Sequence, residues 1–301
     1  MTSNDKLISV VVPTYNYAHY LPRVLDSVLG QWADDLELVI VDDGSTDDTG
    51  AVLARYAERS PSIRVIRQPN GGAASARNLG VSNARGQYVL PLDADDELVP
   101  SALQVFRSML TAHPGADLML AGHLSVMPDG RERLRTPAPV KGASPADIAR
   151  AYLLHKCISI SHSCTLVRRE LLAQRPYPQR LRTGEDVPVF AFILVNGQTV
   201  VTDQVVARIH KHADSLRNDR SNEEAYALEM ADEVFSSLPQ SCQFLRPRYV
   251  AQRYLSLFRA AYQARDYAAA RGFYRKALKL SLRQALRWPY LSKALRLLFK
   301  A

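Results

Sequence analysis

Cysteines, long apolar runs and N-terminal signals are scarce or absent in this sequence of 301 residues. Its three cysteines, Cys157, Cys164 and Cys242, form no C-x-x-C pair, which argues against a disulfide framework or a zinc site and favours a reduced, cytosolic setting. The first residues contain no basic start followed by a long apolar stretch, so no secretory signal is expected. No window approaches the roughly eighteen apolar residues that a membrane span needs.

Acidic residues are scarce in only one part of the chain. From Arg246 to the last residue there are fourteen Lys and Arg residues and one acidic residue, Asp266, whereas residues 1–245 carry 24 basic and 29 acidic residues. The overall composition, 47% hydrophobic and 23% charged, is typical of a globular protein. The asymmetry favours an anionic partner for the tail, either a membrane surface or nucleic acid; the alternative is a solvated helical surface.

Short apolar runs alternate with helix-like segments over the first 120 residues. The runs are LISVVVP, LELVIVDD, IRVIRQ and QYVLPLD. Such runs suit strands that are buried on both faces, and their alternation with helices implies right-handed crossovers. We therefore expect an α/β fold with a doubly wound, mostly parallel sheet and helices on both faces. Ligands of such sheets lie beyond the carboxyl ends of the strands, which directs attention to residues 13–16, 42–47 and 93–97.

The rest of the chain predicts a change of architecture. Residues 123–150 are rich in Pro, Gly and Arg and are expected to form a surface connection. From Asn222 onward the pattern is helical, and Pro289 is expected to interrupt a helix that presents Arg275, Lys279, Arg283 and Arg287 as one cationic line beside Leu278, Leu282 and Leu286. We expect one domain over residues 1–221, with halves 1–122 and 123–221, and an all-α extension over residues 222–301.

Two clusters of carboxylates follow apolar runs. In the first, VDDGSTD (41–47), Gly44 permits a tight turn, and Ser45 and Asp47 can cap the next helix. Turn chemistry does not account for Asp43, which is expected at the ligand edge, where its carboxylate can accept a hydrogen bond from the N–H of a base.

The second cluster, Asp93-Ala94-Asp95-Asp96-Glu97, has four carboxylates in five residues. Carboxylates this close raise one another's pKa unless a cation neutralises them. Strand alternation is expected to place Asp93 and Asp95 on one side, where two oxygen donors suit Mg²⁺ or Mn²⁺ bound jointly with phosphates. The sequence therefore predicts a metal site here.

Five motifs resemble glycosyltransferase family 2, whose members have the GT-A fold and are mostly inverting nucleotide-sugar transferases. They are VVPTYN (11–16), VDDGSTD (41–47), NGGAASARNLG (70–80), LDADD (92–96) and GED (184–186). The resemblance covers residues 7–220 and implies that residues 1–122 form the nucleotide-binding half and residues 123–221 the acceptor-side half. The chain departs from the family around GED, where RPYPQRLRT precedes it and VPVF follows it, which puts the acceptor in doubt.

The resemblance implies roles for individual residues on the donor side. Pro13, Thr14 and Tyr15 look like the lining of the nucleobase pocket, with Tyr15 against the base. Asp43 resembles the carboxylate that receives the N3–H of uracil. Arg77 looks like the residue that steadies the nucleotide, with pairing to Asp43 as the alternative.

The remaining roles concern the metal and the acceptor. Asp93 resembles the ribose- or metal-facing member of the Asp-X-Asp pair, and Asp95 the direct metal ligand. His212, in HKHADSL, resembles a further metal or phosphate contact and is preferred to His210. Asp186 resembles the catalytic base, with Glu185 as the alternative and a helix cap as the structural explanation.

The sequence thus predicts a metal-dependent inverting glycosyltransferase with a UDP-sugar or similar donor. A bacterial-type surface glycan or a lipid-linked molecule is the expected acceptor. The basic tail predicts peripheral attachment to an anionic membrane, on the cytoplasmic side, and no nucleic-acid partner is expected because no reader motif accompanies it. The alternative function is a non-catalytic scaffold that acts through its tail. A dinucleotide-binding oxidoreductase is disfavoured, since no G-x-G-x-x-G follows the first strand.

Overall fold

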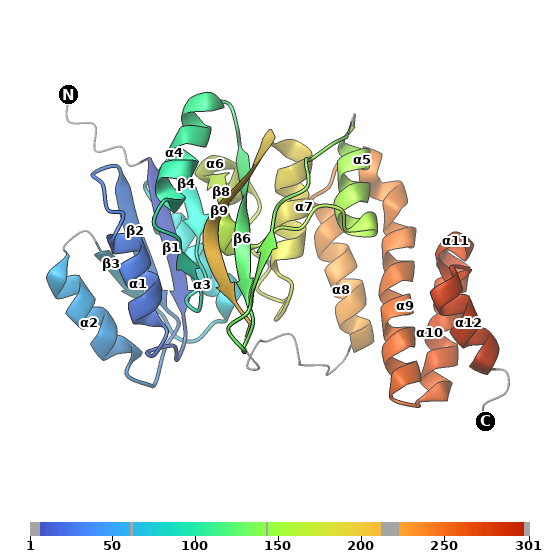
Figure 1. Ribbon diagram of the computed structural model, residues 1–301. Coiled ribbons are helices and arrows are strands. Elements are labelled where there is room, and N and C mark those ends of the chain that lie inside the picture. The colour runs from blue at the N-terminus through green and yellow to red at the C-terminus, as the bar shows by residue number, and fades with distance from the viewer. Residues whose placement is uncertain (1–6, 61–62, 143, 212–222, 298–301) are drawn as a thin grey trace. The chain divides into compact units, whose positions relative to one another are not determined.

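The computed structural model describes residues 7–60, 63–142, 144–211 and 223–297. The chain divides into two compact units (Figure 1). Unit 1 comprises residues 1–141 and 158–217, and unit 2 comprises residues 142–157 and 218–301. The domain boundary expected after residue 221 falls outside the described residues.

Unit 1 is built on one sheet of nine strands. The strands are β1 Ile8–Thr14, β2 Leu36–Asp42, β3 Ile63–Arg67, β4 Tyr88–Pro91, β5 Glu97–Leu98, β6 Leu118–Val126, β7 Glu132–Arg135, β8 Thr165–Arg168 and β9 Thr199–His210. Their order is β3-β2-β1-β4-β8-β6-β9-β5, with β7 paired to β6. The first four strands of this order are parallel, as the sequence predicts. Beyond them, β8 runs antiparallel to β4 and β6, and β9 runs parallel to β6.

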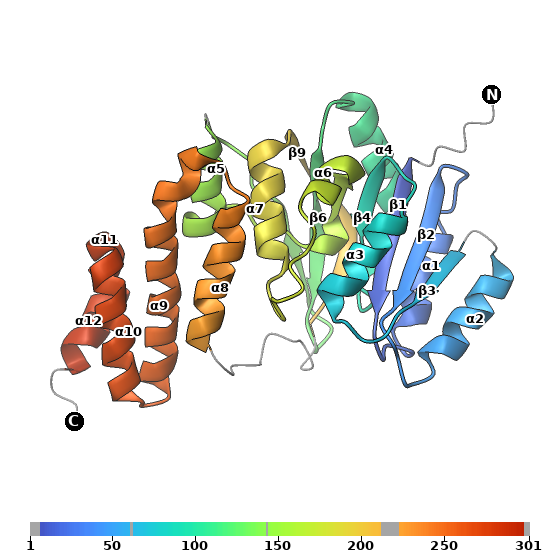
Figure 2. The ribbon, with the colours of Figure 1, turned by 180° about the vertical axis from the view of Figure 1, so that it is seen from behind.

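Helices cover both faces of this sheet (Figures 1 and 2). They are α1 Leu21–Leu29, α2 Thr49–Arg59, α3 Ala73–Asn83, α4 Ala102–Ala112, α6 Arg169–Gln174 and α7 Asp186–Asn196, with a short 3₁₀ turn, η2, at His162–Cys164. Figure 1 shows α1 and α4 on one face, and Figure 2 shows α3 and α6 on the other. The alternation of side chains along β1 explains this double cover: Ile8, Val10 and Val12 join the core with α1 and α4, whereas Val11 points to α3.

The expected surface connection over residues 123–150 is wrong in its first part. Strand β6 continues to Val126, and β7 pairs with it in an antiparallel hairpin closed by Met127 N donating to the carbonyl of Arg131 at 2.8 Å. Gly130, with φ of +80°, lies in the turn. All four residues of β7 are exposed, so the strand has no buried apolar side that would reveal it in the sequence.

Unit 2 is helical. Its elements are α5 Pro145–Ala149, η1 Arg150–His155, α8 Glu223–Ser236, η4 Gln240–Leu245, α9 Arg246–Gln263, α10 Tyr267–Leu280, α11 Leu282–Ala285 and α12 Trp288–Leu297. Helix α9 packs against α8 through Phe235 and Tyr249, and against α10 through Phe258 and Tyr274, whose rings lie 5.8 and 5.1 Å apart. None of the helices in the described ranges is long and apolar enough to cross a bilayer.

The expected continuous helix from Asp266 to Pro289 is wrong. The chain leaves helical geometry at Ser281, with φ of −160° and ψ of 98°, and α11 then packs beside α10. Pro289 does not interrupt a helix but lies in the first turn of α12, where proline is tolerated because that N–H has no helical partner. The cationic and leucine lines are therefore divided between separate helices.

Candidate active site

The carboxyl ends of β1, β2 and β4 meet at one edge of the parallel strands. Thr14 is in register with Asp42, and just beyond β4 the amide of Leu92 donates to the carbonyl of Val11 at 2.9 Å. Thr14 is buried, and its hydroxyl has no hydrogen-bond partner in the described part of the chain. The side chain of Tyr15, the next residue, is 44% exposed. A buried, unpaired hydroxyl and an exposed aromatic ring thus lie where the sequence predicts a ligand.

The PTYN loop is tied to the loop that follows β2. Asn16 has φ of 54°, and its side-chain oxygen accepts from the amide of Thr46 at 2.8 Å. The amide of Asn16 donates to the Ser45 hydroxyl at 2.9 Å, so Ser45 serves this link and does not cap α2. Asp47 does accept from the amide of Thr49, the first residue of α2. These bonds fix the loop that carries Pro13, which is partly buried in β1 opposite Val41.

Asp43 is buried and anchors the glycine loop before α3. One carboxylate oxygen accepts from the amide of Gly71 at 2.8 Å and from the side-chain amide of Gln68 at 2.6 Å, and the other accepts from the amide of Gly72 at 2.8 Å. A carboxylate has about four acceptor positions, so one remains for a further donor. Gly44, with φ of +76°, is required because a Cβ there would lie 2.8 Å from the amide nitrogen of Asn70.

Residues 93–96 form a turn, closed by the amide of Asp96 donating to the carbonyl of Asp93 at 3.1 Å. Strand alternation ends before this turn, so the expectation that alternation aligns Asp93 and Asp95 is wrong. Both side chains are half-buried. Asp96 is buried and accepts from the Ser163 hydroxyl at 2.5 Å and from the amide of His210 at 3.0 Å. It thereby joins the turn to η2 and to the end of β9.

The three carboxyl groups of the turn differ in their electrostatic surroundings. Burial raises the pKa of Asp96 well above its usual value, and the charges of Asp93 and Asp95 raise it further. Burial would also raise the pKa of Asp93, but Arg77 and His162 outweigh it and hold that pKa well below the usual range. Asp93 is therefore anionic, whereas burial and the two neighbouring carboxylates oppose ionisation of Asp96.

Arg77, on α3, joins the Asp-X-Asp turn to the GED motif. Its guanidinium donates to Asp93 at 2.8 Å and to Glu185 at 2.5 Å, and it lies 5.7 Å from the centre of the Tyr177 ring. The side chain is only 9% exposed. Burial opposes the charge, but the two carboxylates raise the pKa of Arg77, which stays protonated. The structure thus pairs Arg77 with these two carboxylates, whereas the alternative partner, Asp43, is bound to the glycine loop.

The GED motif begins α7. Gly184 has φ of +67°, and the amide of Val187 donates to its carbonyl at 3.0 Å. Glu185 stands at the N-cap position but makes no capping hydrogen bond, because its carboxylate is paired with Arg77. Asp186, the first residue of the helix, is partly buried. The two acidic residues therefore have different surroundings, and the capping explanation does not hold for Glu185.

Two buried residues beside this network were not predicted from the sequence. His162 lies with Nδ1 3.8 Å from Asp93, and its ring packs 5.6 Å from Tyr177 and 5.4 Å from Phe190. His162 Nε2 and the Tyr177 hydroxyl are buried without a hydrogen-bond partner in the residues described. Neither residue belongs to a recognisable motif, and contacts across more than 60 residues of sequence give no local signal.

Metal-binding capacity rests on few side chains. No group of three His, Cys, Asp or Glu residues within the described ranges lies close enough to hold a metal ion. His212, the third predicted ligand, lies outside the described residues. His210 is described, and its Nε2 is 3.3 Å from Glu97. Of the predicted ligands, Asp93 and Asp95 are the two in the described residues. Two carboxylates fit an ion such as Mg²⁺, which commonly binds one or two carboxylates together with substrate phosphates.

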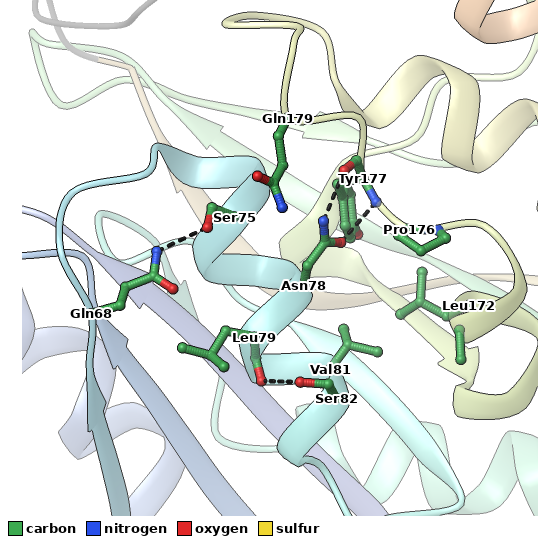
Figure 3. Close-up of a pocket in the computed structure, with 11 residues that line it drawn as sticks. Gln68, Ser75, Asn78, Leu79, Val81, Ser82, Leu172, Pro176, Tyr177 and Gln179 are labelled. Carbon is green, nitrogen blue, oxygen red and sulfur yellow. Dashed lines mark hydrogen bonds between the residues drawn. The ribbon is translucent and has the colours of Figure 1, made fainter.

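A hollow of about 420 Å³ lies between α3 and residues 172–179 (Figure 3). Asn78 closes one wall by exchanging two hydrogen bonds of 2.8 Å with the backbone of Tyr177. Gln68 borders the hollow and also donates to Asp43. None of the predicted metal, nucleotide or catalytic residues lines this hollow, so we place the candidate site at the strand edge.

Comparison with known proteins decides the family. The model of the family "Glycosyl transferase family 2" matches residues 9–175, which is more than half of the chain. The chain belongs to glycosyl transferase family 2. Four of the five motifs lie within the matched range, and GED follows it, so the family predicted from the sequence is confirmed.

Relatives in this family align with parts of the chain. The chondroitin synthase of Pasteurella multocida (strain Pm70) is 40% identical over 124 residues, covering 41% of this chain and 13% of its own. A glycosyltransferase of unknown specificity from Nostoc is 40% identical over 136 residues, covering 45% and 41%. Glycosyltransferase GlyG of Streptococcus pneumoniae is 44% identical over 93 residues, covering 31% of each chain. The chain thus spans less than half the length of these relatives.

Two solved structures share the fold. The structure of S. aureus TarS residues 1–349 in complex with UDP has a TM-score of 0.65 at 20% identity, covering 97% of this chain and 88% of that one. The mannosyltransferase PcManGT of Pyrobaculum calidifontis, in complex with GDP-Man and Mn²⁺, has a TM-score of 0.52 at 18% identity, covering 99% and 85%. The expected GT-A-type α/β fold followed by a helical region is confirmed.

Proposed function

We propose that this protein is a metal-dependent inverting glycosyltransferase, which moves a sugar from a nucleotide-sugar to a hydroxyl of its acceptor. The observation that carries the proposal is the double pairing of Arg77. One buried guanidinium holds Asp93 of the metal motif and Glu185 of the base motif, so these motifs, far apart in sequence, form one site. Membership of glycosyl transferase family 2 supports the reaction class.

A UDP-sugar is the proposed donor. Tyr15 packs on the base, with Pro13 and Thr14 beside it, and Asp43 accepts the N–H of the base. The exposed Tyr15 ring, the unpaired Thr14 hydroxyl and the remaining acceptor position of Asp43 support this arrangement. The TarS complexes with UDP and UDP-GlcNAc favour uridine, whereas the complex of the mannosyltransferase with GDP-Man makes guanosine the alternative.

Asp95 and Asp93 are the proposed ligands of Mn²⁺ or Mg²⁺, and His212 is a further ligand. The place of both half-buried carboxyl groups in one turn just beyond β4 supports this assignment. The mannosyltransferase complex with Mn²⁺ is consistent with it. When bound, the ion acts as a Lewis acid that stabilises the leaving nucleoside diphosphate. Arg77 orients Asp93 for this task through the 2.8 Å pair.

Asp186 is the proposed general base. Its carboxylate takes the proton of the acceptor hydroxyl as that oxygen attacks the anomeric carbon, while the bond from this carbon to the diphosphate oxygen breaks. Attack opposite the leaving group inverts the configuration. The pairing of Glu185 with Arg77 supports Asp186, because the Glu185 carboxylate is already held by a buried guanidinium.

A surface glycan or a lipid-linked molecule is the proposed acceptor, and the cytoplasmic face of the cell membrane is the proposed location. The support for this location is the fourteen basic residues from Arg246 to the last residue. Attachment there would bring the enzyme to an acceptor carried by a lipid.

Release of nucleotide from a panel of UDP- and GDP-sugars, without acceptor, tests the function. We expect slow hydrolysis of one donor with Mn²⁺ or Mg²⁺ and none in excess chelator. The scaffold alternative predicts no release from any donor under either condition. Hydrolysis that continues in excess chelator would overturn the metal assignment and leave the transferase assignment in place.

A further inference from the structure

Exposed apolar side chains gather where α10, α11 and α12 meet. Eleven large hydrophobic side chains are exposed in the described residues, and five of them lie within sixteen positions of unit 2. We call these five the Leu280–Leu295 surface: Leu280 (38% exposed), Leu282 (63%), Leu286 (52%), Trp288 (72%) and Leu295 (48%). Scattered single exposures are ordinary, but such a concentration indicates an interaction site.

The local fold turns these side chains outward. After the break at Ser281, Gln284 and Ala285 are buried, and the Tyr274 hydroxyl donates to the carbonyl of Ala285 at 3.2 Å. Leu282 and Leu286 lie four residues apart and share one face of this short turn. Trp288 and Leu295, seven residues apart, share one face of α12. Gln284 and Ala285 take the inner positions here, and Leu297 takes that of α12, so the exposed leucines are not needed to fill the core of unit 2.

Cations accompany the apolar side chains. Lys279, Arg283, Arg287 and Arg296 are all exposed, and no ion pair of these four occurs in the part of the chain that the structure describes. Arg283 and Arg287 directly follow Leu282 and Leu286. No acidic residue follows Asp266 in the sequence. The surface therefore combines unshielded positive charge with apolar groups and an aromatic ring.

We propose that the Leu280–Leu295 surface docks on an anionic membrane. Trp288 and the leucines enter the boundary between headgroups and acyl chains, and the four cations contact lipid phosphates. Charge complementarity selects this occupant, because an apolar protein partner would not require four unpaired cations. The proposal rests on the membrane location proposed above and deepens it: a folded corner of three helices makes the contact, in place of one continuous amphipathic helix.

Tryptophan fluorescence can test the contact directly. The chain has two tryptophans, and Trp32 packs against the core of unit 1. In a Trp32→Phe background, Trp288 is the single reporter. We expect its emission to shift to shorter wavelength and to be quenched by brominated acyl chains in vesicles of phosphatidylglycerol and phosphatidylcholine. Vesicles of phosphatidylcholine alone should produce a much smaller change at the same lipid concentration.

Matched variants separate the apolar contribution to membrane binding from the charged one. Leu282→Ser with Leu286→Ser, and Arg283→Gln with Arg287→Gln, should each lower partitioning into anionic vesicles by about tenfold or more. Leu134→Ser, at a 57% exposed leucine of β7 in unit 1, should leave partitioning unchanged. Donor hydrolysis is measured on every variant and should not change, which keeps this test separate from that of the transferase activity.

Co-sedimentation with the same vesicles tests the membrane location independently of the Leu280–Leu295 surface. Co-sedimentation without a change in Trp288 emission would overturn the proposed surface and leave the membrane location standing. Absence of co-sedimentation would overturn both. A shift in emission that rises with protein concentration in the absence of lipid, together with a dimer in analytical ultracentrifugation, would show that a second copy covers the surface and would overturn the membrane proposal.

Discussion

Single residues carry most of the argument for the site, and Arg77 is the most informative. Its position in the SARN string predicts a place near the nucleotide, but its two carboxylate partners are 16 and 108 positions away. The sequence could identify Asp93, Glu185 and Asp186 as candidate site residues, because each belongs to a motif. It could not reveal that Arg77 pairs with the first of the two acidic residues of GED, Glu185.

Arg77→Gln should lower the free energy of unfolding by about 3 kcal/mol or more, because it removes a buried guanidinium and leaves the partly buried carboxylates of Asp93 and Glu185 without their cation. Arg131→Gln is the control: its side chain is 81% exposed and lies 2.6 Å from the exposed Asp129, so the loss should stay below about 1 kcal/mol. Urea unfolding of both variants measures the difference. Equal losses would show that the Arg77 network does not stabilise the fold.

Asp95→Asn should lower the rate of metal-dependent transfer at least about a hundredfold, because one of the two proposed carboxylate ligands loses its charge. Asp129→Asn, in the exposed turn between β6 and β7, is a carboxylate control and should keep the wild-type rate. Initial rates at saturating donor over a series of Mn²⁺ concentrations are the measurement. Wild-type turnover by Asp95→Asn would remove this residue from the metal site.

His123, on β6, predicts a pH dependence of stability. Burial, with the nearby charges of Lys211 and Arg135, lowers the pKa of His123 from 6.5 to about 4. Between pH 6.5 and 4, His123 is protonated in the unfolded chain but neutral in the folded protein. The contribution of neutral His123 to the free energy of unfolding is therefore complete above pH 6.5 and decreases as the pH falls toward 4. The loss should be about 1 kcal/mol after allowance for partial exposure.

Urea unfolding between pH 7.5 and 4.5 tests this effect through the difference between wild type and His123→Gln, because other groups titrate in both proteins. His113→Gln, at an exposed histidine, should keep the wild-type pH profile. Identical profiles for wild type and His123→Gln would contradict the assignment.

At the scale of elements, the sequence predicts the parallel half well and the tail less well. The runs before PTYN, DDGSTD and DADDE are almost entirely apolar, broken only by Ser9 and Glu37, so the sequence pattern alone indicates buried strands and their order along the chain. Strand β7 has no buried face, and Ser281 is not a strong helix breaker, so neither the hairpin nor the break between α10 and α11 has a sequence signal. Both depend on contacts with neighbouring elements.

Helix α3 shows how close packing sets an element in place. A Cβ at Gly80 would collide with the side chain of Val11 on β1, so Gly80→Ala should lower the free energy of unfolding by about 1–3 kcal/mol. Gly50→Ala, in α2, meets nothing within 4 Å and should raise it, by up to about 1 kcal/mol, through helix propensity. Thermal unfolding of the pair checks both signs. A neutral Gly80→Ala would mean that α3 can shift away from β1.

At the scale of the whole molecule, two compact units carry two proposed tasks. Unit 1 has the motifs of glycosyl transferase family 2 and the candidate site, and unit 2 has the Leu280–Leu295 surface. Removing all residues after Ala270 cannot separate these tasks, because it also removes the aromatic contacts of Tyr254 and Phe258 with α10. Point substitutions in each unit are the cleaner route.

The central claim is that Asp186 acts as the base of a transfer reaction in the site that Arg77 assembles. The most direct test compares Asp186→Asn with wild type in nucleotide affinity, by calorimetry with UDP and Mn²⁺, and in single-turnover transfer. The account predicts near-normal affinity and a kcat lower by about two to four orders of magnitude. Weakened UDP binding with normal turnover of bound donor would contradict it and would assign Asp186 to the donor pocket.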